Sequence, residues 1–325
     1  MKKSKVQPQP GDKVLWIRFS AFGDVLQAAA AAQCFKKKYP GINLTFMTLP
    51  MYAGILDVQP YIDDRIYWDV KKRPHDFLKA IHRVRASNFD WIFSMHRVAS
   101  AALIALFSGV RWRFGYNRIL QFCYRGTHLE FFNAMGVDIA SRNDVAIFTT
   151  QEHRDEAKTM LSSLPEKKIF AVIGASKAQK LWPVRYWKIF LREALQQGWG
   201  VILNGHGDSE MSIAKEIETE LHEPALLNLA GRLHFPLMAA VAQACTVAVG
   251  NDTGPLHLAA LSGVPTLGFF GSTNSYRTGY RMPWFREVRV SCPYEGCRDY
   301  RCPVECLADI SPEKAFGVFR DFMEF

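Results

Sequence analysis

The sequence lacks any sign of membrane insertion or export. It contains no run of about 18 apolar residues, so we expect no transmembrane helix. Lys2 and Lys3 are followed by Gln, Pro, Gly and Asp instead of an apolar stretch, so we expect no secretion signal. The seven cysteines are an odd number, and without an export signal they indicate a reducing compartment. These absences predict a cytoplasmic protein.

Two common nucleotide-binding fingerprints are also missing. There is no G-x-G-x-x-G, because the nearest approach, Gly205-His-Gly207, lacks the third glycine. There is no G-x-x-x-x-G-K-[ST] phosphate loop either. These absences weaken the interpretation of the chain as a dehydrogenase or a nucleoside triphosphatase.

What the chain does have is size, apolar content and positive charge. Its 325 residues are 49% hydrophobic, enough to bury a large core, and the length favours two domains. The net charge of +9 indicates an anionic partner, which could be a nucleotide, a nucleic acid or an anionic membrane surface.

Apolar strands alternate with helices in two similar halves. In the first half we expect strands at 13–19, 44–48, 66–68 and 91–94, with helices at 24–38 and 75–86. In the second half we expect strands at 168–173, 200–203, 226–228, 246–249 and 265–270, with helices at 183–197, 209–222 and 236–244 and one near Pro255. Such alternation predicts parallel sheets with right-handed crossovers, formed twice. The fold class is therefore α/β, with two Rossmann-like doubly wound domains facing a central cleft.

The domain boundary is expected in the polar stretch 163–167. This gives a first domain at 1–165 and a second at 166–310. Ser311 and Pro312 are typical of a helix start, so 311–325 forms a last helix that could pack back on the first domain.

The most informative stretch is 249–271, which reads VGNDTGPLHLAALSGVPTLGFFG. A strand breaks at Gly250 and a helix begins near Pro255, with Asp252 or Thr253 available to cap it. A helix N-terminus behind a glycine-bearing loop is typical of a phosphate site, although an ordinary capped helix is equally consistent. His257 could face the same loop or simply pack.

Ligands of doubly wound domains bind at the carboxyl ends of the strands. The candidate residues at these ends can therefore be collected. The first domain offers Ser20, Gly23 and Asp24. The second domain offers Ser176, Lys177, Lys180, the loop 205–210 and the loop 251–254.

Three motifs carry a family resemblance. S-A-F-G-D-V-L-Q at 20–27, K-L-W-P at 180–183 and N-D-T-G-P-L-H-L-A-A at 251–260 resemble the heptosyltransferases of glycosyltransferase family nine. The resemblance covers nearly the whole chain. It implies the GT-B architecture and inverting transfer from ADP-L-glycero-D-manno-heptose to Kdo or heptose units on lipid A, in the lipopolysaccharide inner core. It also implies work at the cytoplasmic face of the inner membrane, in peripheral contact with its anionic surface.

The resemblance assigns roles to individual residues. It makes Asp24 the catalytic base, although an aspartate there could merely cap the following helix. It makes Lys180 the cation that neutralises the diphosphate, where the plainer interpretation is a solvated surface lysine. It assigns the remaining donor contacts to Ser176, Asn251, Asp252, Thr253, Gly254 and His257, and a ribose contact to Asp208 or Glu210, between which the sequence does not decide. Lys180 and the helix terminus remove the need for a catalytic metal.

Acceptor binding is expected in the first domain. Besides Ser20 and Gly23, the candidates are the cations Lys72, Arg73, Arg111 and Arg113, interleaved with aromatic residues. Arginine forks suit carboxylates and phosphates of the acceptor. The same residues would suit an anionic membrane or single-stranded nucleic acid, or form a solvated face.

Four cysteines cluster near the end of the chain, at Cys292, Cys297, Cys302 and Cys306. Four thiolates could make a structural zinc or iron site, although the spacing is looser than the usual C-x2-C pairs. Reduced thiols and adventitious disulfides are the alternatives.

Two other functions stay open at this point. One is a transferase of the same fold with another nucleotide sugar or a protein acceptor, as in the heptosyltransferases that modify autotransporters. The other is a non-catalytic protein that binds a nucleotide sugar or nucleic acid. The dispersed charge and the missing nucleic-acid motif argue against a nucleic-acid partner.

Overall fold

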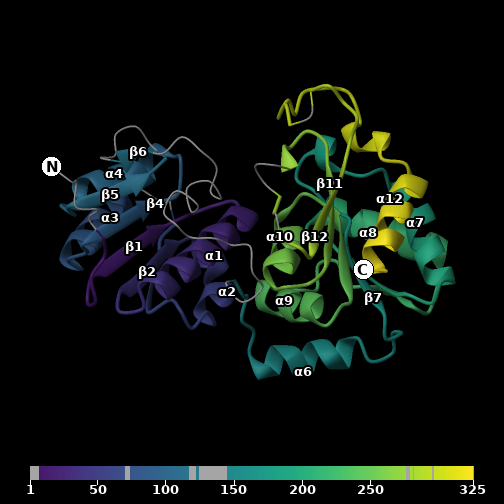
Figure 1. Ribbon diagram of the computed structural model, residues 1–325, viewed down its shortest axis with the longest axis horizontal. Coiled ribbons are helices and arrows are strands. Elements are labelled where there is room, and N and C mark those ends of the chain that lie inside the picture. Colours follow the sequence, from purple (N-terminus) through teal and green to yellow (C-terminus); the bar gives the residue numbers. More distant parts are fainter. Residues whose placement is uncertain are drawn as a thin grey trace. The chain divides into compact units, whose positions relative to one another are not determined.

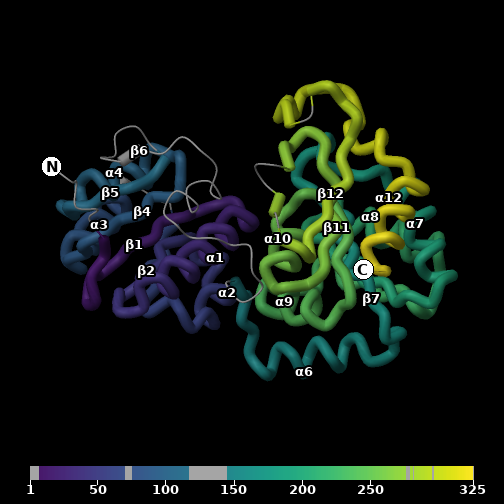
Figure 2. Tube along the Cα trace, viewed as in Figure 1, coloured from purple at the N-terminus to yellow at the C-terminus, as the bar shows by residue number. Residues whose placement is uncertain are grey.

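The chain forms two compact units, Met1–Phe148 and Thr149–Phe325. The computed structural model describes residues 7–69, 74–116, 122–123, 145–275, 279–280, 282–294 and 296–324 (Figures 1 and 2). The division falls earlier than the expected boundary at 165. The reason is that α6 (Gln151–Met160) packs against α9 (Phe235–Gln243) and so belongs to the second unit.

The first unit is a parallel α/β sheet with the strand order β3-β2-β1-β4-β5-β6. Its strands are β1 (Lys13–Ile17), β2 (Asn43–Thr48), β3 (Asp64–Tyr67), β4 (Trp91–Ser94), β5 (Trp112–Gly115) and β6 (Phe122–Cys123). Its described helices are α1 (Phe22–Lys38), α2 (Ala53–Asp57), α3 (Pro74–Ala86) and α4 (Ala99–Phe107). The order, reversing at β1, is that of a doubly wound sheet.

The second unit repeats this topology. Its sheet has the order β12-β11-β10-β7-β8-β9, again with every pair parallel. The strands are β7 (Lys168–Val172), β8 (Gly200–Asn204), β9 (Leu226–Asn228), β10 (Val247–Asn251), β11 (Thr266–Phe270) and β12 (Phe285–Arg289). The helices not yet named are α7 (Val184–Gln196), α8 (Asp208–Leu221), α10 (Gly254–Leu261) and α12 (Pro312–Met323), with a short 3-10 turn, η2 (Ala178–Lys180). The predicted pair of doubly wound sheets is confirmed.

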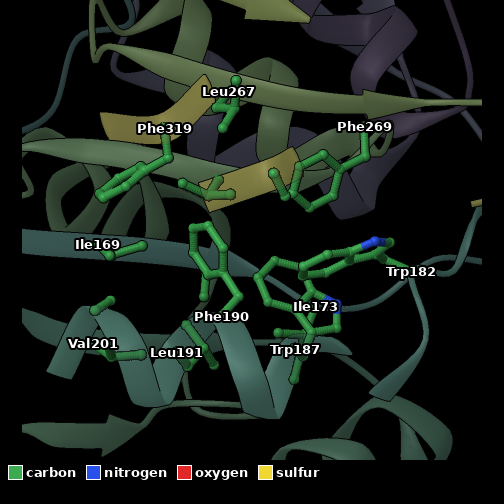
Figure 3. Close-up of a cluster of buried hydrophobic side chains, with 14 of the residues drawn as sticks. Ile169, Ile173, Trp182, Trp187, Phe190, Leu191, Val201, Leu267, Phe269 and Phe319 are labelled. Atoms are coloured by element: carbon green, nitrogen blue, oxygen red, sulfur yellow. The ribbon is translucent and has the colours of Figure 1, made fainter. Parts of the chain in front are cut away.

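Aromatic side chains fill the core between the second sheet and its helices. Trp182 is 1% exposed and lies with its ring centroid 5.0 Å from that of Trp187 and 4.7 Å from that of Phe269 (Figure 3). The indole N–H of Trp182 donates to the carbonyl of Ile310 at 2.8 Å. The Trp of the K-L-W-P motif therefore anchors the loop that carries Lys180 to the core.

The last helix, α12, packs against α7 within the second unit. Ser311 caps it, with its hydroxyl accepting from the amide of Lys314 at 3.2 Å, as the sequence predicts. The buried Phe316 and Phe319 contact Phe190 of α7, with ring centroids 5.3 and 5.5 Å away. Burying this apolar face stabilises the helix where it lies. No described helix is long and apolar enough to cross a membrane.

Candidate functional site

A buried cluster of charges lies at the carboxyl edge of the second sheet. Asp252, directly after β10, has a side chain only 3% exposed. Its Oδ2 lies 3.2 Å from Nζ of Lys180, and its Oδ1 lies 3.1 Å from Nε2 of His257. Lys180 is thus held against a carboxylate, with 17% of its side chain still exposed, and is no solvated surface lysine. His257, which the sequence left open, faces the same loop.

The electrostatics of this cluster keep Asp252 ionised. Burial alone would raise the pKa of Asp252. The hydrogen bond from His257, the positive charge of Lys180 and a hydrogen bond from Thr273 outweigh burial and hold the pKa of Asp252 well below its usual range. The carboxylate therefore stays charged at any physiological pH, and the cation beside it stays in place.

The N-terminus of α10 opens beside this cluster. Thr253 is the N-cap residue, but its side chain makes no capping hydrogen bond. Its hydroxyl donates instead to the carbonyl of Asn251 at 3.3 Å, and Asp252 is engaged with Lys180 and His257. Capping by Asp252 or Thr253, as considered from the sequence, is wrong. The amides in the first turn of a helix have no acceptor within that helix, so those of α10, including that of Gly254, are suited to an anion.

Asn251 holds two loops together. Its side-chain oxygen accepts from the amide of Trp182 at 3.0 Å, and its side-chain nitrogen donates to the carbonyl of Ile173 at 2.8 Å. The residue is fully buried. The expected direct donor contact of Asn251 finds no support, because its amide positions the backbone around Lys180.

The structure places Glu210 and Asp208, the two candidates for the ribose contact, in different surroundings. Glu210 reaches back over the end of β7: a Cβ built on Gly174 would lie 2.1 Å from its Oε2. That oxygen also accepts from the amide of His206 at 2.7 Å. Asp208, in contrast, is exposed at the first position of α8. Ser176 is exposed in the loop after β7. Glu210 thus lies at the sheet edge that carries the charged cluster.

Asp24 lies at the carboxyl edge of the first sheet, in the first turn of α1. Its Oδ2 lies 2.5 Å from Nη2 of Arg18 and accepts from the amide of Ala21 at 3.2 Å. Arg18 is buried, and another nitrogen of its guanidinium donates to the carbonyl of Met95. Burial lowers the pKa of Arg18, and the charge of Asp24 opposes this shift. Asp24 caps its helix and also keeps 40% of its side chain exposed.

Two residues that follow β4, His96 and Arg97, were not singled out from the sequence. Arg97 follows β4, is exposed, and has its guanidinium 5.5 Å from the ring centroid of Tyr116, which follows β5. Both residues interact electrostatically with Arg18. His96 accepts at Nδ1 from the amide of Phe19 at 3.1 Å. The available signal was position, because His96 and Arg97 come shortly after the carboxyl end of β4 in a doubly wound sheet.

Two of the cations expected to bind the acceptor lie away from this edge. Arg111 and Arg113 lie at the amino end of β5, where Arg113 hydrogen-bonds the carbonyl of Val110 and Arg111 covers Trp112. Amino and carboxyl ends of parallel strands lie at opposite edges of a sheet. Lys72 and Arg73 fall outside the described residues. Ser20 and Gly23 do lie at the carboxyl edge, on either side of Ala21 and Phe22.

A cavity of about 320 Å³ opens at the carboxyl end of β3 in the first unit. Tyr67 and Trp68 form one side of it, and α3 contributes Asp76, Lys79 and Arg83. Aromatic rings with charged and polar groups around them are suited to a sugar ring and its hydroxyls.

The four clustered cysteines are free thiols in the structure. Cys292 and Cys297 are exposed, and burial together with the neighbouring thiols raises the pKa of Cys306. Among the described residues, which leave out Glu295, no three His, Cys, Asp or Glu side chains gather in a way that could hold a metal ion. The zinc or iron site considered from the sequence is therefore unsupported.

The two doubly wound units, with a cation beside a helix N-terminus in one and a partly exposed carboxylate in the other, have the fold of solved glycosyltransferases. A family model described as glycosyltransferase family 9 (heptosyltransferase) matches residues 77–308. Because the match spans more than half of the chain, the chain belongs to this family.

Curated and solved relatives agree. Lipopolysaccharide heptosyltransferase 1 of Campylobacter coli is 24% identical over 307 residues, covering 83% of this chain and 86% of the relative. The crystal structure of a family 9 glycosyl transferase from Veillonella parvula has a TM-score of 0.86 at 18% identity and covers 98% of this chain and 99% of that one. The E. coli heptosyltransferase WaaC with ADP has a TM-score of 0.72 at 16% identity, over 95% and 99%. These likenesses show the GT-B fold.

Proposed function

We propose that this enzyme transfers L-glycero-D-manno-heptose from ADP-heptose to a Kdo or heptose hydroxyl of the lipopolysaccharide inner core, with inversion at the anomeric carbon. The observation that carries the proposal is the Lys180–Asp252–His257 cluster beside the uncapped N-terminus of α10. Family membership and a related fold solved with ADP and with ADP-2-deoxy-2-fluoro heptose support the donor. The names of curated relatives support the lipopolysaccharide acceptor.

On the donor side, Lys180 and the N–H groups at Thr253 and Gly254 would hold the diphosphate. The departing ADP gains negative charge in the transition state, so these groups lower the barrier beyond their effect on binding. Asp252 is acidic and would not bind phosphate directly. It holds the lysine in position, and its carboxylate can accept from a sugar hydroxyl at the rim of the site.

Glu210 is our choice for the ribose contact. Its carboxylate lies over the Gly174 backbone at the sheet edge, and each carboxylate oxygen can accept from more than one donor. A ribose diol offers two hydroxyl donors to such a group. Asp208, exposed at the start of α8, does not share this position.

On the acceptor side, Asp24 would act as general base. It would take the proton from the attacking hydroxyl as that oxygen bonds to the anomeric carbon and the bond to ADP breaks. Arg18 pairs with the carboxylate and fixes its orientation. Arg97 presents an exposed guanidinium that can bind a Kdo carboxylate or a lipid A phosphate beside the base. In this proposal Arg97 has the acceptor-binding role that the sequence led us to expect for Arg111 and Arg113.

The acceptor would be reached at the cytoplasmic face of the inner membrane. The net charge of +9 favours peripheral contact with an anionic bilayer surface. Sedimentation with vesicles of anionic or neutral lipid tests this part by itself. Binding to both kinds alike would contradict an electrostatic contact.

The decisive assay combines purified enzyme, ADP-heptose and Kdo–lipid A. We expect release of ADP together with a glycolipid one heptose heavier, whose new linkage has the anomeric configuration opposite to that of the donor. Parallel reactions with UDP-, GDP- and CDP-sugars test the donor base. Transfer from another nucleotide sugar, or a product that retains the donor's configuration, would contradict the proposal.

A further inference from the structure

The loop that carries the four cysteines is joined to the donor edge of the second sheet. We name the described residues 292–294 and 296–306 the cysteine arm, which is drawn in yellow before α12 in Figure 1. The amide of Gly296 donates to the carbonyl of Gly271 at 2.9 Å, and the amide of Arg298 donates to the carbonyl of Ser272 at 2.9 Å. The arm therefore extends along the segment that leaves β11.

The segment that leaves β11 also contacts the charged cluster of the donor edge. Thr273 hydrogen-bonds Asp252, the partner of Lys180. Packing at Gly271 is tight, since an added Cβ there would lie 3.1 Å from Cβ of Cys306. Gly271–Thr273 thus lie between the cysteine arm and the buried carboxylate.

A second connection reaches the turn that carries Lys180. The side-chain nitrogen of Gln179 donates to the carbonyl of Cys302 at 2.8 Å. The carbonyl of Gln179 accepts from the hydroxyl of Ser272 at 3.3 Å. The ammonium of Lys177 lies 5.8 Å from the ring centroid of Tyr300. The arm therefore contacts this turn at Gln179 and at Lys177, and the segment after β11 contacts it at the Gln179 carbonyl.

We propose that the cysteine arm is a support of the donor site and that Gln179 is a positioning residue for Lys180. The inference rests on the proposed role of Lys180 in holding the diphosphate. The connections use backbone carbonyls and amides of the arm together with the Gln179 and Ser272 side chains. The thiols take no part in them. The backbone conformation of the arm therefore provides the support. A cysteine whose side chain is not needed for packing can be replaced without loss of this support.

The test compares Gln179→Met with Cys302→Ser. Met keeps the volume of Gln but cannot donate to the Cys302 carbonyl, whereas Cys302→Ser leaves that carbonyl unchanged. Loss of one such hydrogen bond should weaken ADP binding and raise the donor KM by roughly three- to tenfold, with the acceptor KM unchanged. Cys302→Ser should bind ADP as the wild type does. Gln196→Met, at an exposed position at the end of α7, is the matched control.

Amide hydrogen exchange gives a readout that needs no ligand. The amides of Lys180 and Leu181 donate within the η2 turn, to the carbonyls of Lys177 and Ala178. They should exchange faster in Gln179→Met but not in the two other variants. If the wild type binds no ADP, the proposed function fails while exchange still tests the support. Unchanged exchange and ADP binding in Gln179→Met, or a loss confined to Cys302→Ser, would overturn the inference.

Discussion

The two sheets have the same strand order but carry very different carboxyl edges. At the edge of the second sheet, Lys180, Asp252 and His257 are tied together in a site almost closed to solvent. At the edge of the first sheet, Asp24 is 40% exposed and Arg97 stands free of any carboxylate within ion-pair distance in the described part of the chain. The same topology thus supports a preorganised edge and an open one.

This difference matches the two tasks that transfer requires. A departing diphosphate is stabilised best by charges that are already fixed, because no reorganisation is then needed as the bond breaks. An acceptor carried on a lipid needs an accessible base. We therefore expect changes at the first edge to affect turnover with ADP binding intact. Changes at the second edge should affect both turnover and ADP binding.

The largest effect is expected at Asp24. Asp24→Asn removes the general base and should reduce kcat by about 10²- to 10⁴-fold. ADP binding, which we assign to the second unit, should be unchanged when measured by calorimetry. Because the variant leaves buried Arg18 without its counter-ion, its folding should be checked by circular dichroism. Turnover close to that of the wild type would remove Asp24 from the mechanism.

The next effect is expected at Lys180. Lys180→Ala removes the cation that we propose for the diphosphate and should reduce kcat by about 10²- to 10³-fold. It should also weaken ADP binding, unlike Asp24→Asn. Because Asp252 is left buried with one partner fewer, the free energy of unfolding should fall by about 2 kcal/mol in urea denaturation. If ADP affinity stayed the same, the contrast between the two edges would be lost.

A smaller effect distinguishes two carboxylates at the second edge. Glu210→Gln weakens a charge-assisted hydrogen bond and should raise the donor KM about tenfold. The matched variant Asp208→Asn, at the exposed start of α8, should leave the donor KM unchanged. Steady-state kinetics with varied ADP-heptose measures both. The reverse ranking would mean that Asp208 makes the ribose contact.

The smallest effect is expected at the open edge. Arg97 is exposed, so Arg97→Ala should raise the acceptor KM by only about three- to tenfold, with donor KM unchanged. Arg111→Ala, at the amino end of β5, serves as the control and should have no effect. Steady-state kinetics with varied Kdo–lipid A at saturating donor would measure the acceptor KM of both variants. A defect in Arg111→Ala alone would restore the acceptor site predicted from the sequence.

Much of the fold could be predicted because each element carries local signals. Most of the central strands are apolar runs bounded by turns, and Ser311-Pro312 marks the start of α12, whereas β5, β6 and the polar β12 were not expected. In contrast, α4 was missed because its sequence, ASAALIALF, is apolar on every face and shows no helical period. The placement of α6 and α12 depends on tertiary packing, which no local pattern specifies.

The candidate site also contains some residues that could be predicted from the sequence and some that could not. Asp24, Lys180, Asp252 and His257 could be found from motifs, because a motif fixes residues close in sequence. The Arg18–Asp24 pair and the Gln179 support could not, because they depend on contacts with Met95 and Cys302 far along the chain. Arg111 and Arg113 were chosen for composition, without regard to the end of the strand they occupy.

Thermal unfolding with ADP, UDP, GDP and CDP at matched concentrations, in the wild type and in Lys180→Ala, tests the central claim most directly. A ligand at one hundred times its Kd stabilises the folded protein by about 2.7 kcal/mol, which is easily measured. We predict selective stabilisation by ADP that is lost in Lys180→Ala. Preference for another nucleotide, or equal stabilisation of the variant, would contradict an ADP-heptose site built around Lys180.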